Sequence, residues 1–252
     1  MAGRSHSGQM RLTQRHVELV VREMADPGFI PLPGYRVATD EDYDALVAEI
    51  LAASPEEGLW VFAYGSLLWN PAFDFVDRHL GVAHGWHRDF CLGWDRRFRG
   101  SVDRPGLMLA LDRGGQCRGA VYRLPPDALK PNMDRLIRRE MSMVPSAFPA
   151  RWIKVKTDAG TVRALTFAMN RKSGRYVSGL SPEQLASVLA TACGFRGSMA
   201  EYLLSTVGQL EALGIHDRHL WRLQELVAER IEREHDPADE TTSARLGERL
   251  VS

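Results

Sequence analysis

The sequence predicts an α+β protein built on a small mixed or antiparallel β-barrel with flanking helices. Between residues 59 and 169, short β-rich runs alternate with glycine-containing turns, a pattern typical of hairpin-connected strands. On both sides of this region, apolar residues instead recur every three to four positions, which indicates helices. We therefore expect an N-terminal helical extension at 1–57, one domain at 58–235, and a flexible polar tail at 236–252.

Composition places this 252-residue chain among soluble globular proteins, because 44% of its residues are apolar and 25% are charged. Its formal net charge is zero, so we expect neither nucleic acid nor an anionic membrane as a partner. The three cysteines lack a C-x-x-C pair, which argues against a disulfide framework and a structural zinc site. No apolar run has the length of a signal peptide core or a membrane span, which favours a cytoplasmic location.

The leading segment predicts two helices and carries no recognisable chemistry. Apolar spacing predicts the first over 12–25, ended before Pro27, after a disordered start at 1–11. The second follows Thr39, a typical N-cap, and ends before Pro55. Its buried stripe is formed by Tyr43, Leu46, Val47, Ile50 and Leu51. We expect these helices to form an accessory layer against the domain.

The central segment predicts six strands joined by turns. The candidates are rich in β-branched and aromatic residues, and they span 59–64, 82–94 with a break, 106–112, 117–124, 151–157 and 161–169. Turn sequences at 112–115 and 158–160 predict a hairpin at each of these positions. Hairpin connections favour an antiparallel sheet or small barrel over a parallel doubly wound sheet.

One helix interrupts the strands, and it ends in a carboxylate. Apolar spacing over 129–140 predicts a helix whose core-facing stripe also contains Glu140. A partly buried carboxylate has a raised pKa, which suits proton transfer, so Glu140 is the candidate catalytic group. The alternatives are a structural ion pair with Arg138, Arg139 or Arg151, or a solvated helix end.

Three further helices are predicted toward the C-terminus. Ser181 followed by proline begins the first, which ends at Gly194. The second spans roughly 198–213 and stops at Gly214, and the third follows Asp217. Each has apolar residues at helical spacing along one side, so we expect all three to pack against the domain.

A buried apolar strand ends abruptly at Tyr64-Gly65-Ser66-Leu67. Where a strand ends in glycine and a small hydroxyl residue, backbone N–H groups become free to face a ligand. We expect this turn to hold the carboxylate and amine of a small substrate. Ser66 lacks the G-x-S-x-G pattern of a nucleophile elbow, so a positioning role is favoured over nucleophilic attack.

Four histidines and one basic loop are further candidates for a site. His84 and His87 are three apart in a predicted strand and so face opposite sides, while His216 and His219 flank a helix start. No H-E-x-x-H pattern accompanies them, so no metal site is predicted. The basic loop is either solvated or in contact with an acidic substrate; its cations are Arg96, Arg97, Arg99 and Arg104.

Several segments together resemble a known family. Residues 61–71 read V-F-A-Y-G-S-L-L-W-N-P and resemble the V-F-G-Y-G-S-L-x-W-N-P signature of the ChaC-like γ-glutamylcyclotransferases. Further similar segments follow in order within roughly 58–230, at 85–91, 105–111, 119–125, 139–141, 200–204 and 210–214. The resemblance implies a γ-glutamylcyclotransferase-like barrel that cleaves glutathione to 5-oxoproline and Cys-Gly, without a metal or redox cofactor.

The resemblance also implies the site residues. Glu140 is the implied proton acceptor, and the implied substrate-binding positions are Val61, Phe62, Ala63, Tyr64, Gly65, Ser66 and Leu67. Glu140 would take the proton of the γ-glutamyl α-amine and return it to the departing amine, while ring closure is intramolecular. Backbone N–H groups of the turn either fix the α-carboxylate or stabilise the developing oxyanion. Arg88 or the basic loop is a candidate contact for the glycine carboxylate.

Two departures from the family pattern leave the substrate open. Ala63 replaces a usual glycine, and the segment after Glu140 has Phe148 where better-known members have a tyrosine, so a hydroxyl is lost. The reaction type is thus better defined than the specificity for glutathione. The alternatives are a cyclotransferase for other γ-glutamyl peptides or amines, and a non-catalytic γ-glutamyl-binding module. The sequence assigns no oligomeric state.

Overall fold

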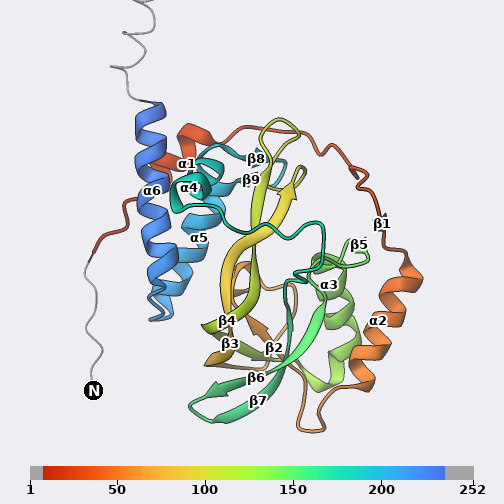
Figure 1. The fold of residues 1–252 in the computed structure, drawn as a ribbon. Coiled ribbons are helices and arrows are strands. Elements are labelled where there is room, and N and C mark those ends of the chain that lie inside the picture. The colour runs from red at the N-terminus through yellow and green to blue at the C-terminus, as the bar shows by residue number, and fades with distance from the viewer. Residues whose placement is uncertain (1–7, 236–252) are drawn as a thin grey trace, which may run out of the picture.

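Five strands close into a barrel at the centre of the molecule (Figure 1). The computed structural model describes residues 8–235. In barrel order the strands are β2 (Trp60–Ala63), β4 (Gly106–Arg123), β3 (Asp77–Asp95), β6 (Ala150–Thr157) and β7 (Gly160–Phe167). Neighbours are antiparallel except β2 and β7, which close the barrel in parallel. The predicted small mixed barrel is therefore confirmed.

Strands β3 and β4 form one long hairpin, which corrects the predicted turn at 112–115. β4 continues through this segment, where Gly114 and Gly115 have φ angles of 109° and 63° and the register with β3 shifts next to Gly85. The glycines thus form an irregularity within paired strands and do not reverse the chain. The reversal lies at 96–105 instead, and β3 starts earlier than predicted, without the predicted break.

Alternate residues of β2 enter two apolar cores. Phe62 packs in a core to which all five barrel strands contribute, whereas Val61 and Ala63 face the core that the barrel shares with the helices. All three side chains are at most 1% exposed. Because burying one large apolar side chain contributes about 1.5–3 kcal/mol, β2 is firmly anchored at the base of the turn that follows it.

The helices predicted after the first strands are confirmed. Their bounds are α3 (Leu129–Glu140), which follows η2 (Pro126–Ala128), α4 (Pro182–Thr191), α5 (Met199–Ala212) and α6 (Arg218–Glu234). The helices α4, α5 and α6 are capped by side-chain oxygens that accept hydrogen bonds from backbone N–H groups, those of Ser181, Ser198 and Asp217 respectively. A small pair, β8 (Cys193–Gly194) and β9 (Gly197–Ser198), joins α4 to α5, and α4, α5 and α6 pack together beside the barrel (Figure 1).

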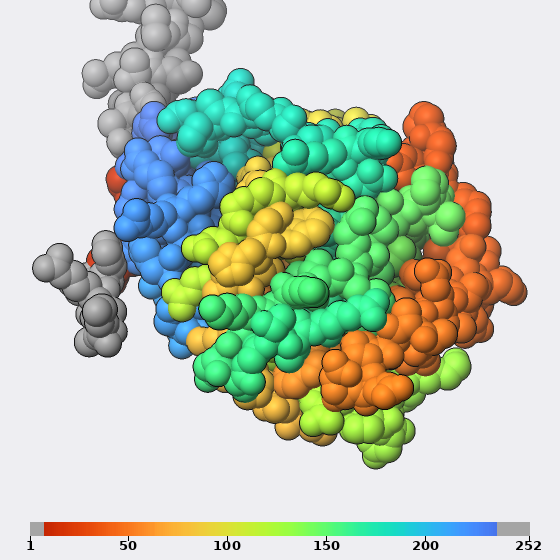
Figure 2. Space-filling view, turned by 60° about the horizontal axis from the view of Figure 1, so that its bottom comes forward, coloured from red at the N-terminus to blue at the C-terminus, as the bar shows by residue number. Residues whose placement is uncertain are grey.

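The leading segment reaches both flanks of the barrel. α1 (Gln14–Val20) packs against α5 and α6, and α2 (Asp40–Ala52) packs against α3. Between them β1 (Arg36–Val37) pairs with β5 (Met143–Val144). The predicted first helix is too long, because the chain becomes extended at Val21 and then crosses to the other flank (Figure 1). Figure 2 shows the α2 part in orange on the side opposite α6, in blue.

Of the start that is predicted to be disordered, at 1–11, the structure describes residues 8–11, and there Arg11 contacts α6. Arg11 forms ion pairs of 2.6 Å with both Glu229 and Glu232. Residues 1–7 and the predicted flexible tail at 236–252 lie outside the described residues. The predicted domain boundaries stay predictions. Within residues 8–235, no helix combines the length and the apolar content that crossing a membrane requires.

Candidate active site

The turn after β2 leads directly into a short helix, η1 (Ser66–Leu68). Gly65 precedes this helix as its N-cap residue and offers no side chain to cap it. The first N–H groups of a helix have no partner within the helix. A Cβ atom at Gly65 would lie 3.3 Å from Leu109 Cδ2 and 3.5 Å from the Tyr202 hydroxyl. Glycine therefore avoids a tight contact with Leu109, while the Tyr202 hydroxyl lies at ordinary van der Waals distance.

Glu140 is the last residue of α3, and its side chain is 17% exposed. Burial raises the pKa of its carboxyl above the ordinary value, and the positive charge of Arg139 opposes this rise. Arg139 Nε lies 3.3 Å from Glu140 Oε1, whereas Arg138 pairs with Asp40 and Asp134. Glu140 thus lies at the buried edge of the helix, as its apolar spacing indicates, and its catalytic role stays a prediction.

Arg139 joins the helix end to the turn. Its Nη2 group donates a hydrogen bond of 3.1 Å to Ser66 Oγ, and its Nη1 group donates to the carbonyl oxygen of Asn70. These partners lie 73 and 69 positions earlier in the sequence. With its Nε against Glu140, one guanidinium contacts both predicted halves of the site.

Two buried tyrosines lie near the same carboxylate. Burial, followed by the negative charge of Glu140, raises the pKa of Tyr202 to about 12, although the charge of Arg99 and a hydrogen bond with the Ser66 side chain oppose the rise. Burial, followed by the charge of Glu140, also raises the pKa of Tyr64 well above its usual range. Both phenols are therefore protonated near pH 7. Tyr64 donates a hydrogen bond of 2.9 Å to the carbonyl oxygen of Phe167.

Tyr202 is a residue of this cluster that the sequence reasoning did not single out. It is 4% exposed on α5, with the rings of Trp69 and Phe90 centred 6.0 and 6.2 Å from its own. The guanidinium carbon of Arg99 lies 5.7 Å from the centre of the tyrosine ring. An aromatic residue on an apolar helix stripe looks like ordinary packing. The sequence signal that could have identified Tyr202 is its place within the segment 200–204, which resembles the family.

Three of the predicted binding residues lie within β2 itself. Val61, Phe62 and Ala63 pair through their backbones with β4, and their side chains fill the two cores. Thr166 Oγ1 donates a hydrogen bond of 3.0 Å to the carbonyl oxygen of Phe62. These side chains support the turn from within the protein. Substrate contact stays a prediction for all three, as it does for Tyr64, Gly65, Ser66 and Leu67.

Arg88 lies behind the turn, with a side chain that is only 2% exposed. Its Nη1 group donates a hydrogen bond of 2.8 Å to the carbonyl oxygen of Tyr64, and its Nη2 group donates to the carbonyl oxygen of Arg118. Its Nε lies 3.1 Å from Asp217 Oδ2, an ion-pair contact without hydrogen-bond alignment. The geometry favours a residue that positions the turn; contact with a glycine carboxylate stays a prediction.

The basic loop divides into a structural part and a part near the cluster. Arg97 makes a two-point ion pair with Asp26 of the leading segment, at 2.8 and 2.9 Å. Arg99 pairs with Glu201 and lies over the ring of Tyr202. Arg99 is therefore the loop cation that the structure brings to the cluster around Glu140.

The candidate histidines lie elsewhere. Within the described residues, no group of three His, Cys, Asp or Glu side chains could hold a metal ion. His84 lines one cavity, and His87, His216 and His219 line a second that adjoins it. Neither cavity is lined by Glu140 or by the turn after β2.

Comparison with known proteins points to one family. The family model described as ChaC-like protein matches residues 59–230. A glutathione-specific gamma-glutamylcyclotransferase of Escherichia coli strain K12 is 39% identical over 179 residues, which are 70% of this chain and 76% of that relative. Glutathione-specific gamma-glutamylcyclotransferase 1 of Homo sapiens is 29% identical over 179 residues, 65% of this chain and 76% of that relative.

The fold has a counterpart among solved structures. The crystal structure of a gamma glutamyl cyclotransferase specific to glutathione from yeast aligns with a TM-score of 0.64 at 20% identity. The alignment covers 71% of this chain and 99% of the yeast chain. Together with the match to the family model over most of the domain, these similarities show that the chain belongs to the ChaC-like family.

Proposed function

We propose that this chain is a γ-glutamylcyclotransferase that cleaves glutathione to 5-oxoproline and Cys-Gly. Relatives whose names state that specificity support the proposal. The observation that carries it is the meeting of a partly buried Glu140 with the turn after β2, through Arg139. A cytoplasmic location belongs to the same proposal, because buried free thiols at Cys91, Cys117 and Cys193 suit a reducing compartment.

Glu140 acts as the base and then as the acid. It removes a proton from the γ-glutamyl α-amine, and the amine nitrogen attacks the γ-carbonyl carbon to form the five-membered ring. The bond from that carbon to the cysteinyl nitrogen breaks, and Glu140 returns the proton to this departing nitrogen. Burial makes the carboxylate a stronger proton acceptor, because it raises the pKa of Glu140.

The surrounding groups bind and orient the substrate. N–H groups at Gly65–Leu67 either hold the α-carboxylate or stabilise the oxyanion that forms on the γ-carbonyl oxygen. Tyr202 is neutral and so offers a hydroxyl donor beside Ser66. Arg139 opposes the effect of burial on the pKa of Glu140 and so favours the ionised carboxylate. Arg99 is the candidate contact for the carboxylate of the departing peptide.

Replacement of the base tests the proposal directly. Glu140→Gln keeps the shape of the side chain but cannot accept a proton, so release of 5-oxoproline from glutathione is expected to fall by about 10²–10⁴-fold. Asp134→Asn is a matched control, since Asp134 lies on the same helix and pairs with Arg138 at the surface. Full activity of Glu140→Gln would rule out Glu140 as the base.

A different γ-glutamyl substrate is the second candidate, and Phe148 favours it. Phenylalanine offers no hydroxyl to a substrate at position 148. Its ring is centred 6.3 Å from that of Phe167, and the carbonyl oxygen of Phe167 accepts a hydrogen bond from the Tyr64 hydroxyl. Competition between glutathione and a γ-glutamyl dipeptide, with 5-oxoproline as the product measured, separates the two specificities. Binding of both without any 5-oxoproline would identify a non-catalytic module.

A further inference from the structure

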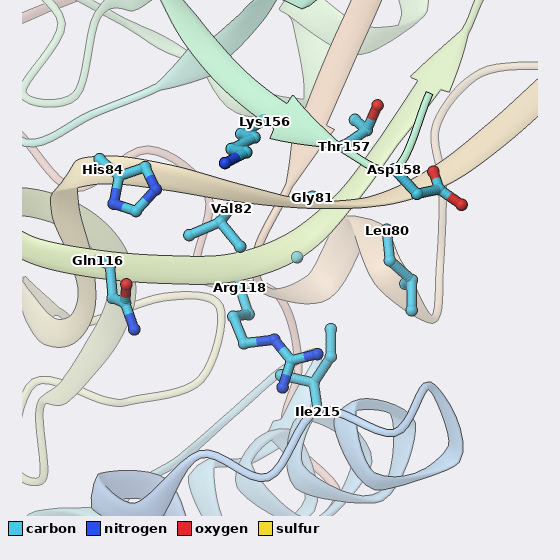
Figure 3. A pocket seen from close by; sticks show the side chains of 11 residues that line it. Leu80, Gly81, Val82, His84, Gln116, Arg118, Lys156, Thr157, Asp158 and Ile215 are labelled. Atoms are coloured by element: carbon cyan, nitrogen blue, oxygen red, sulfur yellow. The ribbon is translucent and has the colours of Figure 1, made fainter. Parts of the chain in front are cut away.

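Two adjoining cavities, of about 380 and 490 Å³, lie away from the cluster around Glu140. Gln116, Arg118 and Ile215 line both, so the cavities form one groove between β3, β4, β6 and the loop before α6. Figure 3 shows the smaller cavity. We name it the cationic groove, after three of its lining residues: Arg118, Lys156 and Arg218.

The unopposed charge in the cationic groove is positive. Arg118, Lys156 and Arg218 are exposed, and none of them forms an ion pair with another residue in the range 8–235. Each of the three carboxylates of the lining has another partner: Asp217 lies 3.1 Å from Arg88, and Asp89 and Asp158 lie 3.6 and 3.5 Å from the imidazoles of His219 and His79. An incoming anion therefore meets three cations that form no ion pair with a carboxylate in the described range.

These cations come from three different elements. Arg118 belongs to β4, Lys156 to β6, and Arg218 begins α6. Figure 3 shows Lys156 and His84 on one side of the pocket and Arg118 beside Ile215. A single carboxylate offers its two oxygens in one plane, whereas phosphate groups present oxygens in several directions and carry more charge. The arrangement thus fits a phosphate-bearing anion better than a monocarboxylate.

Arg88 connects the cationic groove to the turn after β2. It lines the larger cavity, and its guanidinium donates to the carbonyl oxygens of both Arg118 and Tyr64. It also contacts Asp217, the residue before Arg218. Arg118 and the neighbouring pair Asp217 and Arg218 belong to two segments that hold Arg88 in place. An anion bound by Arg118 and Arg218 therefore contacts both of these segments.

We propose that the cationic groove binds a small phosphate-bearing metabolite with at least two negative charges, and that binding alters the turn at Tyr64 through Arg88. The cavity volumes are those of small-molecule sites. Ile215 supplies an apolar wall for the carbon part of the ligand. The binding site stands on its own, whereas its effect on the turn rests on the proposed function.

Calorimetric titration of the full chain with inorganic diphosphate, at fixed ionic strength and without divalent metal, tests the binding site. Saturable binding is expected, and Arg118→Gln or Lys156→Gln should each weaken it about tenfold or more. Lys154→Gln is the matched control, because Lys154 is exposed on the same strand but does not line either cavity. Its dissociation constant should stay within about twofold of the wild-type value.

Three results would overturn the binding site. These are the absence of saturable binding, unchanged binding in both groove variants, or an equal loss in Lys154→Gln, which would indicate a non-specific charge effect. Inorganic monophosphate serves as the second probe and should bind about tenfold more weakly than diphosphate. Equal affinity for the two probes would contradict the requirement for several charges.

The link to the turn has a separate test. Saturating diphosphate should change kcat/KM for 5-oxoproline release by the wild-type protein and leave that of Arg118→Gln unchanged. Binding without a change in kcat/KM would overturn the link and leave the site standing. If the chain turned over no γ-glutamyl compound, the calorimetric result would still decide the binding site, so the two failures are distinguishable.

Discussion

The two halves of the proposed active site are held in different ways. The turn after β2 continues from a strand whose side chains are buried in two cores, and Arg88 holds its backbone from behind. Glu140 instead lies where a helix ends. The segment after it is held by the short pairing of β1 with β5 and by the Ala38 N–H, which donates to the carbonyl oxygen of Ser142 at 3.1 Å. Packing therefore fixes the first half on every side, whereas the second half is packed only up to the end of α3, and backbone hydrogen bonds hold the chain beyond Glu140.

This difference predicts which substitutions unfold the protein and which alter the reaction. Phe62→Ala should have the largest effect, a loss of about 3–5 kcal/mol of unfolding free energy, because it empties part of the barrel core. Urea unfolding measures this loss, and Phe29→Ala is the control, since Phe29 is 38% exposed and its truncation should cost less than about 0.5 kcal/mol. A fully stable Phe62→Ala variant would contradict the idea that packing anchors the turn.

Arg139→Met should lower activity more than stability. It removes the contact between Glu140 and the turn, and a displacement of the base is expected to lower kcat by about tenfold. Because Arg139 lowers the pKa of Glu140, its loss should move the acid limb of the kcat/KM profile to higher pH. Arg138→Met, whose partners are Asp40 and Asp134, should leave that limb in place. A profile unchanged in Arg139→Met would show that the two residues are not coupled.

Glu140→Gln should stabilise the protein near neutral pH while removing activity. Burial raises the folded-state pKa of Glu140 above its unfolded value, so between these two values the folded state binds more protons. Stability supplied by the protonated carboxyl is present below the unfolded pKa and is lost as pH rises through the folded pKa. The amide of the variant does not titrate.

Urea unfolding from about pH 4 to about pH 8 compares the two proteins. The stability of the wild-type protein should fall relative to that of Glu140→Gln as pH increases across this range. Parallel pH dependences would mean that the pKa of Glu140 is the same in the folded and unfolded states.

Ala38→Pro should have the smallest effect. It removes the N–H group that donates to Ser142, at a cost of about 1 kcal/mol, next to a β1 strand that is already extended. We expect a fall of a few fold in kcat with little change in KM, because the segment after Glu140 loses one support. Ala38→Val, which keeps the N–H group, should retain the wild-type kcat. An equal loss in both variants would point to the side chain at position 38.

The sequence predicts the features whose signals lie within one element. The helix over 129–140 places Glu140 by its own apolar spacing, and Ser181 marks the start of α4 by local capping. The segment at 112–115 misleads for the opposite reason. An Asp-Arg-Gly-Gly sequence fits both a turn and a bulge, and pairing with β3 near Gly85 selects the bulge.

Other features depend on contacts that no local pattern contains. Arg88 and Arg139 acquire their positions from backbone carbonyl groups that are distant in sequence. Tyr202 has the spacing of a core residue, and its nearness to Glu140 arises from the packing of α5. The strands β1 and β5 have two residues each, too few to show any periodicity.

The parallel closure of the barrel has a consequence for the order of folding. Trp60 pairs with Ala164 and Val61 with Leu165, so β2 lacks one neighbour until the chain has been synthesised beyond β7. The contact of Arg88 with Asp217 requires still later residues. Long-range contacts of this kind form late during synthesis from the N-terminus. The turn after β2 is therefore translated before the rest of the site. The contacts that position this turn are complete only after the start of α6 has left the ribosome.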